Sequence, residues 1–367
     1  MKKIHIISFD YPDPPIYGGI IDIYWKIVYL RLMGVYVILH AFVKDTNAEY
    51  NFNIADQVFL YPRKPMWRSV FSSLPFIVDT RRDAKLLTNL LQDDAPILFE
   101  GLHTTFLINN KAIRHRRKIY RESNIEHDYY HALYLAAASW WQRLYYKIES
   151  KRLYHYEKIL QYADVIISVS SSDQRQLQIR YPNAKHIVIY SFHPYKEFNQ
   201  DTCIGTYNLF HGNLSVAENE NALNYLLDNI VPSLKIPLIV AGKNPSEAVR
   251  IKCRANNVTL IANPSQEKME ELISRAQVLL LYTDQATGLK LKLLISYYIG
   301  RHIVSNSKML VGTPLEGMIT SCDTNEAYIH EVNKRSFVPF DKNKDRIVID
   351  AFDNKLNASL LYDMIDY

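Results

Sequence analysis

Two lysines, Lys290 and Lys292, fall in the first turn of a predicted helix, where their charge calls for a chemical explanation. The strand before them is predicted to end at Tyr282, a polar loop reaches Gly288, and the helix closes at Gly300. The amino-terminal end of a helix is partly positive, so two cations there are unfavourable unless an anion binds over the same turn. A diphosphate would suit this arrangement. The alternative is that both lysines are solvated residues of the helix surface.

Glycines stand at three further strand ends, where the missing side chain lets the backbone approach a phosphate or a sugar closely. These glycines, with the polar residues that follow two of them, are Gly18, Gly19, Gly212, Asn213, Gly242 and Lys243. Gly18 and Gly19 are predicted to form a loop between the first strand and the first helix. The alternative for each glycine is a simple turn or strand cap.

The elements that must position these residues alternate between short apolar stretches and helical patterns. Ile4–Phe9 is predicted as a strand, a helical pattern runs to Met33, and Tyr36–Phe42 is the next strand, which makes one βαβ unit. Further strands are predicted at Ile97–Phe99, Lys118–Arg121, Val165–Val169 and His186–Tyr190. Such alternation indicates a parallel sheet that is covered on both faces.

The pattern changes between Phe192 and Thr206 and then restarts, so we predict a domain 1–200 and a domain 201–367, with a last helix that can pack back on the first domain. The length of 367 residues also favours two domains. In the second domain we predict strands at Tyr207–His211, Pro237–Ala241, Val258–Ile261, Val278–Tyr282 and His302–Ser305, with helices at Asn219–Asn229, Ser246–Ala255, Glu267–Ser274 and Lys290–Ile299. The predicted fold class is α/β, with two Rossmann-like doubly wound sheets facing a central cleft.

Composition excludes several classes of protein. The net charge of +5 permits anionic partners without demanding them, and no nucleic-acid partner is expected. The three cysteines have no paired spacing, so we expect neither disulfides nor a zinc site, and a cytoplasmic location. No signal-peptide or membrane-spanning pattern is evident. The GxGxxG and GxxxxGK[ST] motifs are absent, which counts against dehydrogenases and P-loop enzymes.

The segment Thr283–Asn306 resembles the donor-binding motif of the family 4 retaining glycosyltransferases, which have the GT-B fold. The segment Asn208–Glu247 resembles the opening of that family's nucleotide-binding domain. The resemblance implies a nucleotide-sugar donor whose diphosphate contacts Lys290 and Lys292. The donor-binding residues that it implies are Gly18, Gly19, Gly212, Asn213, Gly242, Lys243, Gly288, Lys290 and Lys292.

The sequence departs from the family at two positions. Two glutamates eight residues apart are common there, and the second contacts the ribose of the nucleotide. Thr287 and Ile295 stand at these positions here. Diphosphate binding is therefore the firmer expectation, and ribose recognition is open.

In the first domain, the resemblance implies polar residues on the acceptor or sugar side of the cleft. His103 matches a histidine near the sugar and acceptor, and we predict it as catalytic together with Lys292. The other predicted residues of this side are Glu100, Arg121, Asn124 and His127. A histidine or glutamate near the acceptor hydroxyl can orient it or accept its proton. The alternative is that any one of the twelve histidines lies there by chance.

An aromatic and apolar helical face precedes the middle of the chain, at Trp140, Trp141, Leu144, Tyr145 and Ile148. A basic run lies upstream. Aromatic and cationic side chains together could contact a membrane surface or a lipid-linked acceptor. The more ordinary alternative is an interdomain or core face.

The resemblance therefore implies a retaining glycosyltransferase that moves a sugar from a nucleotide-diphosphate sugar to a hydroxyl of a glycan or lipid-linked acceptor. The expected setting is polysaccharide or lipopolysaccharide biosynthesis, in the cytoplasm or at the cytoplasmic face of the membrane. Neither a cofactor nor a metal ion is expected. The alternatives are a non-catalytic sugar-nucleotide or glycan-binding protein of the same fold, and a sugar-nucleotide epimerase.

Overall fold

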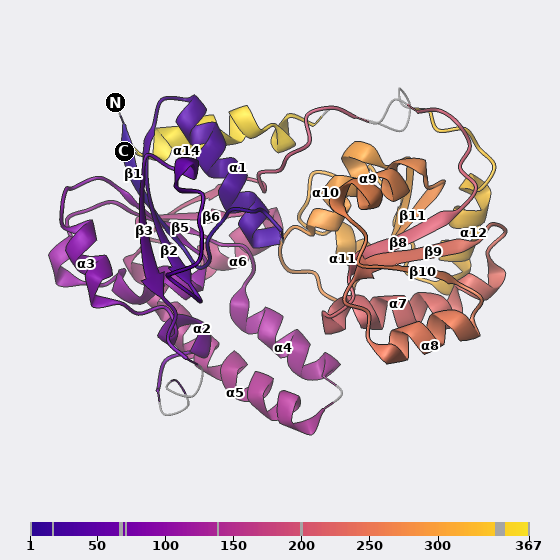
Figure 1. Cartoon of the computed structure of the whole chain (residues 1–367), viewed down its shortest axis with the longest axis horizontal. Coiled ribbons are helices and arrows are strands. Elements are labelled where there is room, and N and C mark those ends of the chain that lie inside the picture. Colours follow the sequence, from indigo (N-terminus) through magenta and orange to yellow (C-terminus); the bar gives the residue numbers. More distant parts are fainter. Residues whose placement is uncertain are drawn as a thin grey trace.

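The structure is a computed structural model that describes residues 2–16, 18–65, 69, 72–137, 139–198, 201–341 and 349–365. Its first half is built on a seven-stranded parallel sheet with the strand order β3-β2-β1-β4-β5-β6-β7 (Figure 1). The strands are β1 (Lys3–Ser8), β2 (Tyr36–Val43), β3 (Gln57–Pro62), β4 (Ile97–Glu100), β5 (Lys118–Arg121), β6 (Val165–Ser168) and β7 (Lys185–Val188). The predicted strands of this half are present, and β3 is an edge strand that the prediction missed.

Helices cover both faces of this sheet, as a parallel sheet requires. The helices are α1 (Gly18–Leu32), α2 (Phe76–Asp79), α3 (Ala84–Leu90), α4 (Glu126–Ala136), α5 (Trp140–Tyr156) and α6 (Ser171–Arg180). Residues of α1 pack on one face of the sheet, and residues of α2, α3, α5 and α6 pack on the other. Gly18 and Gly19 are the first residues of α1 and not a loop before it, which corrects the prediction.

The second half is built on a five-stranded parallel sheet with the order β10-β9-β8-β11-β12. Its strands are β8 (Asn208–Asn213), β9 (Leu238–Lys243), β10 (Thr259–Ala262), β11 (Val278–Leu281) and β12 (His302–Ser305). Its helices are α7 (Ala217–Asn229), α8 (Glu247–Ala255), α9 (Gln266–Arg275), α10 (Leu291–Ile299), α11 (Ser307–Leu310) and α12 (Asn325–Arg335). α7, α8 and α12 cover one face, and α9, α10 and α11 cover the other. The predicted fold class of two doubly wound parallel sheets is confirmed.

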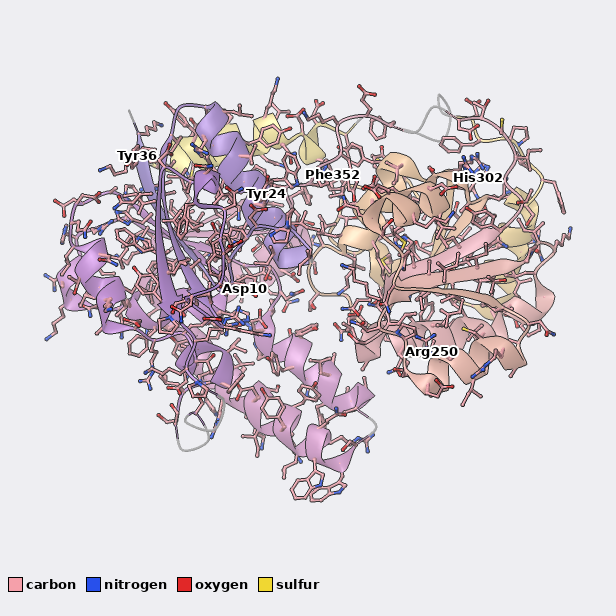
Figure 2. The ribbon with its side chains drawn as sticks, viewed as in Figure 1. Asp10, Tyr24, Tyr36, Arg250, His302 and Phe352 are labelled. Carbon is pink, nitrogen blue, oxygen red and sulfur yellow. The ribbon has the colours of Figure 1, made fainter. Side chains whose placement is uncertain are left out.

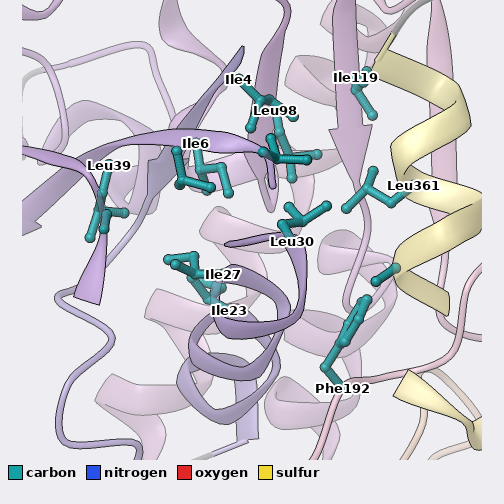
Figure 3. Packing of buried hydrophobic residues seen from close by; sticks show 14 of the residues in the cluster. Ile4, Ile6, Ile23, Ile27, Leu30, Leu39, Leu98, Ile119, Phe192 and Leu361 are labelled. Carbon is teal, nitrogen blue, oxygen red and sulfur yellow. The ribbon is translucent and has the colours of Figure 1, made fainter. Parts of the chain in front are cut away.

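The chain passes between the two halves twice. The first crossing follows β7, and the predicted boundary at residue 200 falls in it, although Asn199 and Gln200 lie outside the described residues. The second crossing leads back from α12 to α14 (Asn354–Ile365). Leu361 of α14 joins the core around Leu30 of α1 and Phe192 of the first crossing (Figure 3).

The two crossings are hydrogen-bonded to each other. The side chain of Asn354 donates to the carbonyl of His193 at 2.7 Å, and the ring of His193 lies 2.9 Å from the carbonyl of Phe352. Figure 2 shows Phe352 between the two halves. The cleft between the sheets is therefore closed along one side by paired segments of chain.

Candidate functional site

A cavity of about 380 Å³ lies between the two halves, where the carboxyl ends of β8 and β9 face the start of α1. Parallel sheets keep their ligand sites beyond these strand ends, at the point where the strand order reverses. The cavity brings together six of the predicted donor-binding residues: Gly18, Gly212, Asn213, Lys243, Lys290 and Lys292. Ile295, at the position of the expected ribose contact, also lies on the wall.

Three helices present their amino-terminal ends to this cavity. Gly18 begins α1, Glu218 and Asn219 lie in the first turn of α7, and Lys290 is the N-cap of α10. The N-cap of α7, Val216, and that of α10, Lys290, make no side-chain cap hydrogen bond. The amino-terminal end of a helix attracts an anion, because its first backbone N–H groups have no partner within the helix and the helix dipole is positive there.

Lys292 is held in the wall by neutral partners. Its Nζ donates to Oδ1 of Asn219 at 3.0 Å and to the carbonyl oxygen of Tyr282 at 3.2 Å. Burial lowers the pKa of Lys292 to about 8, and the neighbouring charge of Lys290 adds to the shift, while Glu218 opposes it. The side chain is thus a desolvated cation at neutral pH, which an anionic ligand would stabilise.

Lys290 and Lys243 complete a group that we call the lysine cluster (Lys243, Lys290 and Lys292). Nζ of Lys290 lies 3.6 Å from Oε1 of Glu218 and donates to the carbonyl of Thr287 at 3.0 Å. Nζ of Lys243 donates to the carbonyl of Ile16 at 3.5 Å and so reaches across to the first half. One carboxylate on the cavity wall faces three lysines, which leaves an excess of positive charge there.

Other residues of the wall were not predicted. His211 is buried beside Lys292, and its Nε2 lies 3.0 Å from Oγ of Ser296. Burial and the charge of Lys292 lower the pKa of His211 to about 3, so its ring is neutral. His193 and Tyr195 of the first crossing also line the cavity. Asn219 carried a sequence signal, since it stands three residues before the Ala-Leu pair of the recognised segment.

Three predicted donor-binding glycines, Gly19, Gly242 and Gly288, do not line the cavity. Close contacts with neighbouring residues explain why a glycine stands at each position. A Cβ atom on Gly19 would lie 2.8 Å from the ring of Phe9, and one on Gly242 would lie 2.2 Å from the carbonyl oxygen of Gly212. Gly288 has a φ of +66°, and its N–H donates to Asp173 of α6 at 2.8 Å. Gly288 therefore joins the two halves, and the donor-binding role of these three glycines stays a prediction.

Arg121 and Glu100, predicted on the acceptor side, belong to a closed charge network (Asp22, Lys26, Glu100 and Arg121). Arg121 lies 3.0 Å from Asp22, and Lys26 lies 3.0 Å from Asp22 and 2.6 Å from Glu100. Although burial alone would raise it, the pKa of Asp22 is lowered to about 2 by Arg121 and Lys26. Arg121 is only 2% exposed. These two residues pair with buried charges and are not on the cavity wall, and their place on the acceptor side stays a prediction.

His127 and Asn124 also contact residues that do not line the cavity. Nδ1 of His127 lies 3.2 Å from Oε1 of Glu157, and its ring packs edge-on against Tyr154. Asn124 packs against Gly288, since a Cβ there would lie 2.3 Å from Oδ1 of Asn124. Both residues therefore lie off the wall of the cavity, and their place on the acceptor side stays a prediction.

His103 contacts Phe9, which packs against the start of α1. Its ring stacks on Phe9, with 4.9 Å between the ring centres, and Phe9 packs against Gly19. Nδ1 of His103 lies 3.9 Å from Oε1 of Glu126. Burial lowers the pKa of His103 well below its usual value, and burial with repulsion from Glu157 raises the pKa of Glu126 to about 8. His103 is not on the cavity wall, and its catalytic role stays a prediction.

Comparisons with known proteins match this architecture to known folds. No protein-family model matches the chain. A curated relative from Klebsiella pneumoniae is described as an uncharacterized 44.6 kDa protein in cps region. It is 26% identical to this chain over 341 residues, and the match covers 85% of each of the two chains. The fold matches Thermosynechococcus elongatus sucrose-phosphate synthase with a TM-score of 0.66, at 13% identity, over 99% of this chain and 95% of that one. It also matches S. aureus TarM, solved with Fondaparinux, alpha-GlcNAc-glycerol and UDP, with a TM-score of 0.68, at 7% identity and over 100% of both chains.

The fold is GT-B. At these identities the likeness concerns the fold, so the chemistry must be argued from the cavity. Among the described residues, no helix is long and apolar enough to cross a membrane. Within the same ranges, no three His, Cys, Asp or Glu side chains gather in a group that could hold a metal ion.

Proposed function

We propose that the protein is a retaining glycosyltransferase of the family 4 kind, which moves a sugar from a nucleotide-diphosphate sugar to an acceptor hydroxyl. The observation that carries the proposal is the lysine cluster at the interdomain cavity, where three helix starts also converge. Phosphate oxygens are the ligands that such a site suits, because backbone N–H groups and lysine charges both favour them.

In this proposal Lys290 and Lys292 stabilise the negative charge that develops on the leaving diphosphate. A preorganised charge in a site that excludes water acts more strongly than one in bulk water, and the burial of Lys292 provides such a setting. The cation is held in place by Asn219 and Tyr282 before the donor binds. The proposal needs no metal ion, since the lysine cluster supplies the positive charge.

The acceptor enters from the first half, and we propose that it is a glycan or a lipid-linked hydroxyl of polysaccharide or lipopolysaccharide biosynthesis. The relative in the cps region supports this setting. His103 is the proposed residue for orienting the acceptor hydroxyl, in its neutral form. The proposed location is the cytoplasm, with peripheral contact to the membrane.

A second candidate function is the binding of a sugar nucleotide or glycan without turnover. It is favoured by the apolar wall that Ile295, Leu291 and Met269 form at the position where a ribose-binding carboxylate is expected. The two candidates differ in whether nucleotide diphosphate is released.

The decisive experiment has two stages. A thermal-shift screen of UDP-, GDP- and ADP-sugars identifies the donor, because a ligand that binds the folded state raises its stability by mass action. Release of nucleotide diphosphate is then measured with a panel of glycan and lipid-linked acceptors. Release that depends on the acceptor supports the transferase. Donor binding without release supports the binding protein, and the absence of any nucleotide-sugar binding contradicts both.

A further inference from the structure

The helix α5 exposes a run of large apolar side chains. Trp140, Trp141, Leu144 and Ile148 are 60%, 65%, 46% and 45% exposed. Positions 140, 144 and 148 are four residues apart and therefore lie on one side of the helix. The interdomain or core interpretation is wrong for these four side chains, and only Tyr145 of the predicted face is half-buried.

The same helix exposes cations and no anion. Arg143, Lys147 and Lys151 are exposed, whereas Glu149, which is the one acidic residue of Trp140–Tyr156, is 1% exposed. Glu149 accepts a hydrogen bond from the backbone N–H of Phe76 and so faces the protein. The exposed side of α5 therefore combines apolar and positively charged groups.

A groove adjoins this side of the helix. It has a volume of about 430 Å³ and is lined by Lys151, Arg152 and His155, together with Ser73, Ile148 and Tyr156. Ile148 and Lys151 thus belong to both the exposed side of α5 and the groove. The cationic side chains of Lys151 and Arg152 suit a phosphate group, and Arg152 also lies 3.8 Å from Oε2 of Glu149.

We propose that α5 docks on an anionic lipid surface, with the apolar side chains in the interfacial layer and a lipid phosphate in the groove. Tryptophan is enriched at the level of lipid headgroups, and basic side chains there are attracted to anionic lipids. α5 packs on α4, which contacts α7 beside the cavity, and Figure 1 shows both helices below the first sheet. The membrane would then lie one helix away from the cleft, within reach of a lipid-linked acceptor.

A second copy of the chain is a poorer occupant of this surface. Two-fold pairing through α5 would bring Arg143, Lys147 and Lys151 against the same residues of the partner, because a two-fold interface pairs a patch with itself. Like charges in contact oppose such pairing, whereas anionic lipid neutralises them.

The inference deepens the proposed function by locating its membrane contact, but its test needs neither donor nor acceptor. The full chain is sedimented with vesicles of phosphatidylcholine alone and of phosphatidylcholine with phosphatidylglycerol. We expect binding to the second kind only, with a blue shift of tryptophan fluorescence. Trp140→Ser with Trp141→Ser, and separately Lys147→Glu with Lys151→Glu, should each weaken binding more than about tenfold.

Matched controls come from exposed residues elsewhere. Ile179→Ser changes an apolar side chain that is 82% exposed on α6, and Lys235→Glu with Lys355→Glu makes the same change in net charge as the α5 pair. Both controls should bind vesicles like the wild type. Circular dichroism and thermal unfolding establish that all variants are folded.

The docking proposal would be overturned if the chain did not bind anionic vesicles or bound both kinds of vesicle equally. It would also be overturned if the wild type were a dimer that the tryptophan substitutions converted to a monomer without any effect on lipid binding. Failure of the proposed function is separate. It would appear as vesicle binding that is intact while no acceptor yields nucleotide diphosphate release.

Discussion

The two halves of the molecule each carry a charged group at the carboxyl edge of their sheet, and the two groups are built differently. The closed charge network of the first half pairs two acidic with two basic side chains, so each charge has an opposite partner. The lysine cluster sets three cations against Glu218 alone on the cavity wall. Charged side chains therefore indicate a ligand site here only where the protein does not balance their charge.

Breaking the closed charge network should give the largest change. Arg121→Met leaves Asp22, whose pKa is about 2, without its guanidinium partner in the interior. We expect the free energy of unfolding to fall by about 3–5 kcal/mol in denaturant titrations, as for other broken buried pairs. Arg254→Met, which breaks the exposed pair with Glu247, should cost less than about 1 kcal/mol. A similar cost for both variants would contradict the comparison.

Lys292→Met tests the other half of the comparison. It removes the charge that we propose contacts the donor phosphate, so donor affinity should fall by about 1.5–3 kcal/mol, roughly tenfold to 150-fold, in calorimetric titrations. Its loss of unfolding free energy should be smaller than that of Arg121→Met, because the partners of Lys292 are neutral. Lys235→Met, on the exposed surface, should leave affinity unchanged. Unchanged affinity in Lys292→Met would remove this lysine from the site.

The pH dependence of donor binding gives a smaller effect. The pKa of Lys292 is about 8, so the side chain is mostly charged at pH 7 and mostly neutral at pH 9. If the charged form alone binds phosphate, affinity weakens by up to about tenfold over this range. Calorimetry above pH 8 should also detect proton uptake on binding, since phosphate restores the charge of Lys292. Equal pH profiles for the wild type and Lys292→Met would rule out titration of Lys292.

Glu218→Gln should give the smallest change, and one of opposite sign. The amide keeps an acceptor for the hydroxyl of Thr283 and removes the negative charge beside Lys290. Donor affinity at pH 7 and low salt should rise by about threefold, the size expected for one partly screened charge. The gain should vanish at high salt. Weaker binding at pH 7 would contradict this prediction.

Most of the fold was predictable, because buried parallel strands are continuous apolar runs between helical patterns. The missed strand, β3, lies at the edge of its sheet, and most of its residues are only half-buried. An edge strand packs against one neighbour, so its sequence carries a weaker apolar signal. The start of α1 was misplaced because paired glycines are typical of turns.

The candidate site was predictable where its residues stand at the carboxyl ends of strands of one parallel sheet. Lys243 ends β9 and Lys290 follows β11, and parallel topology brings them to one edge. The buried pairing of Arg121 was not predictable because its partner Asp22 is 99 residues away in the sequence. His193 and Tyr195 were missed because a crossing segment has no periodic pattern.

The pairing of the two crossings has a mechanical consequence. With Asn354 bonded to His193, the two crossings are tied together, and a rotation about this pairing is the opening of the cleft that would leave the bond intact. His193 lies on the axis and also on the cavity wall, whereas Gly18 and Lys292 come from opposite sides of the cleft. The affinity of a ligand that contacts all three residues would therefore depend on the angle between the halves.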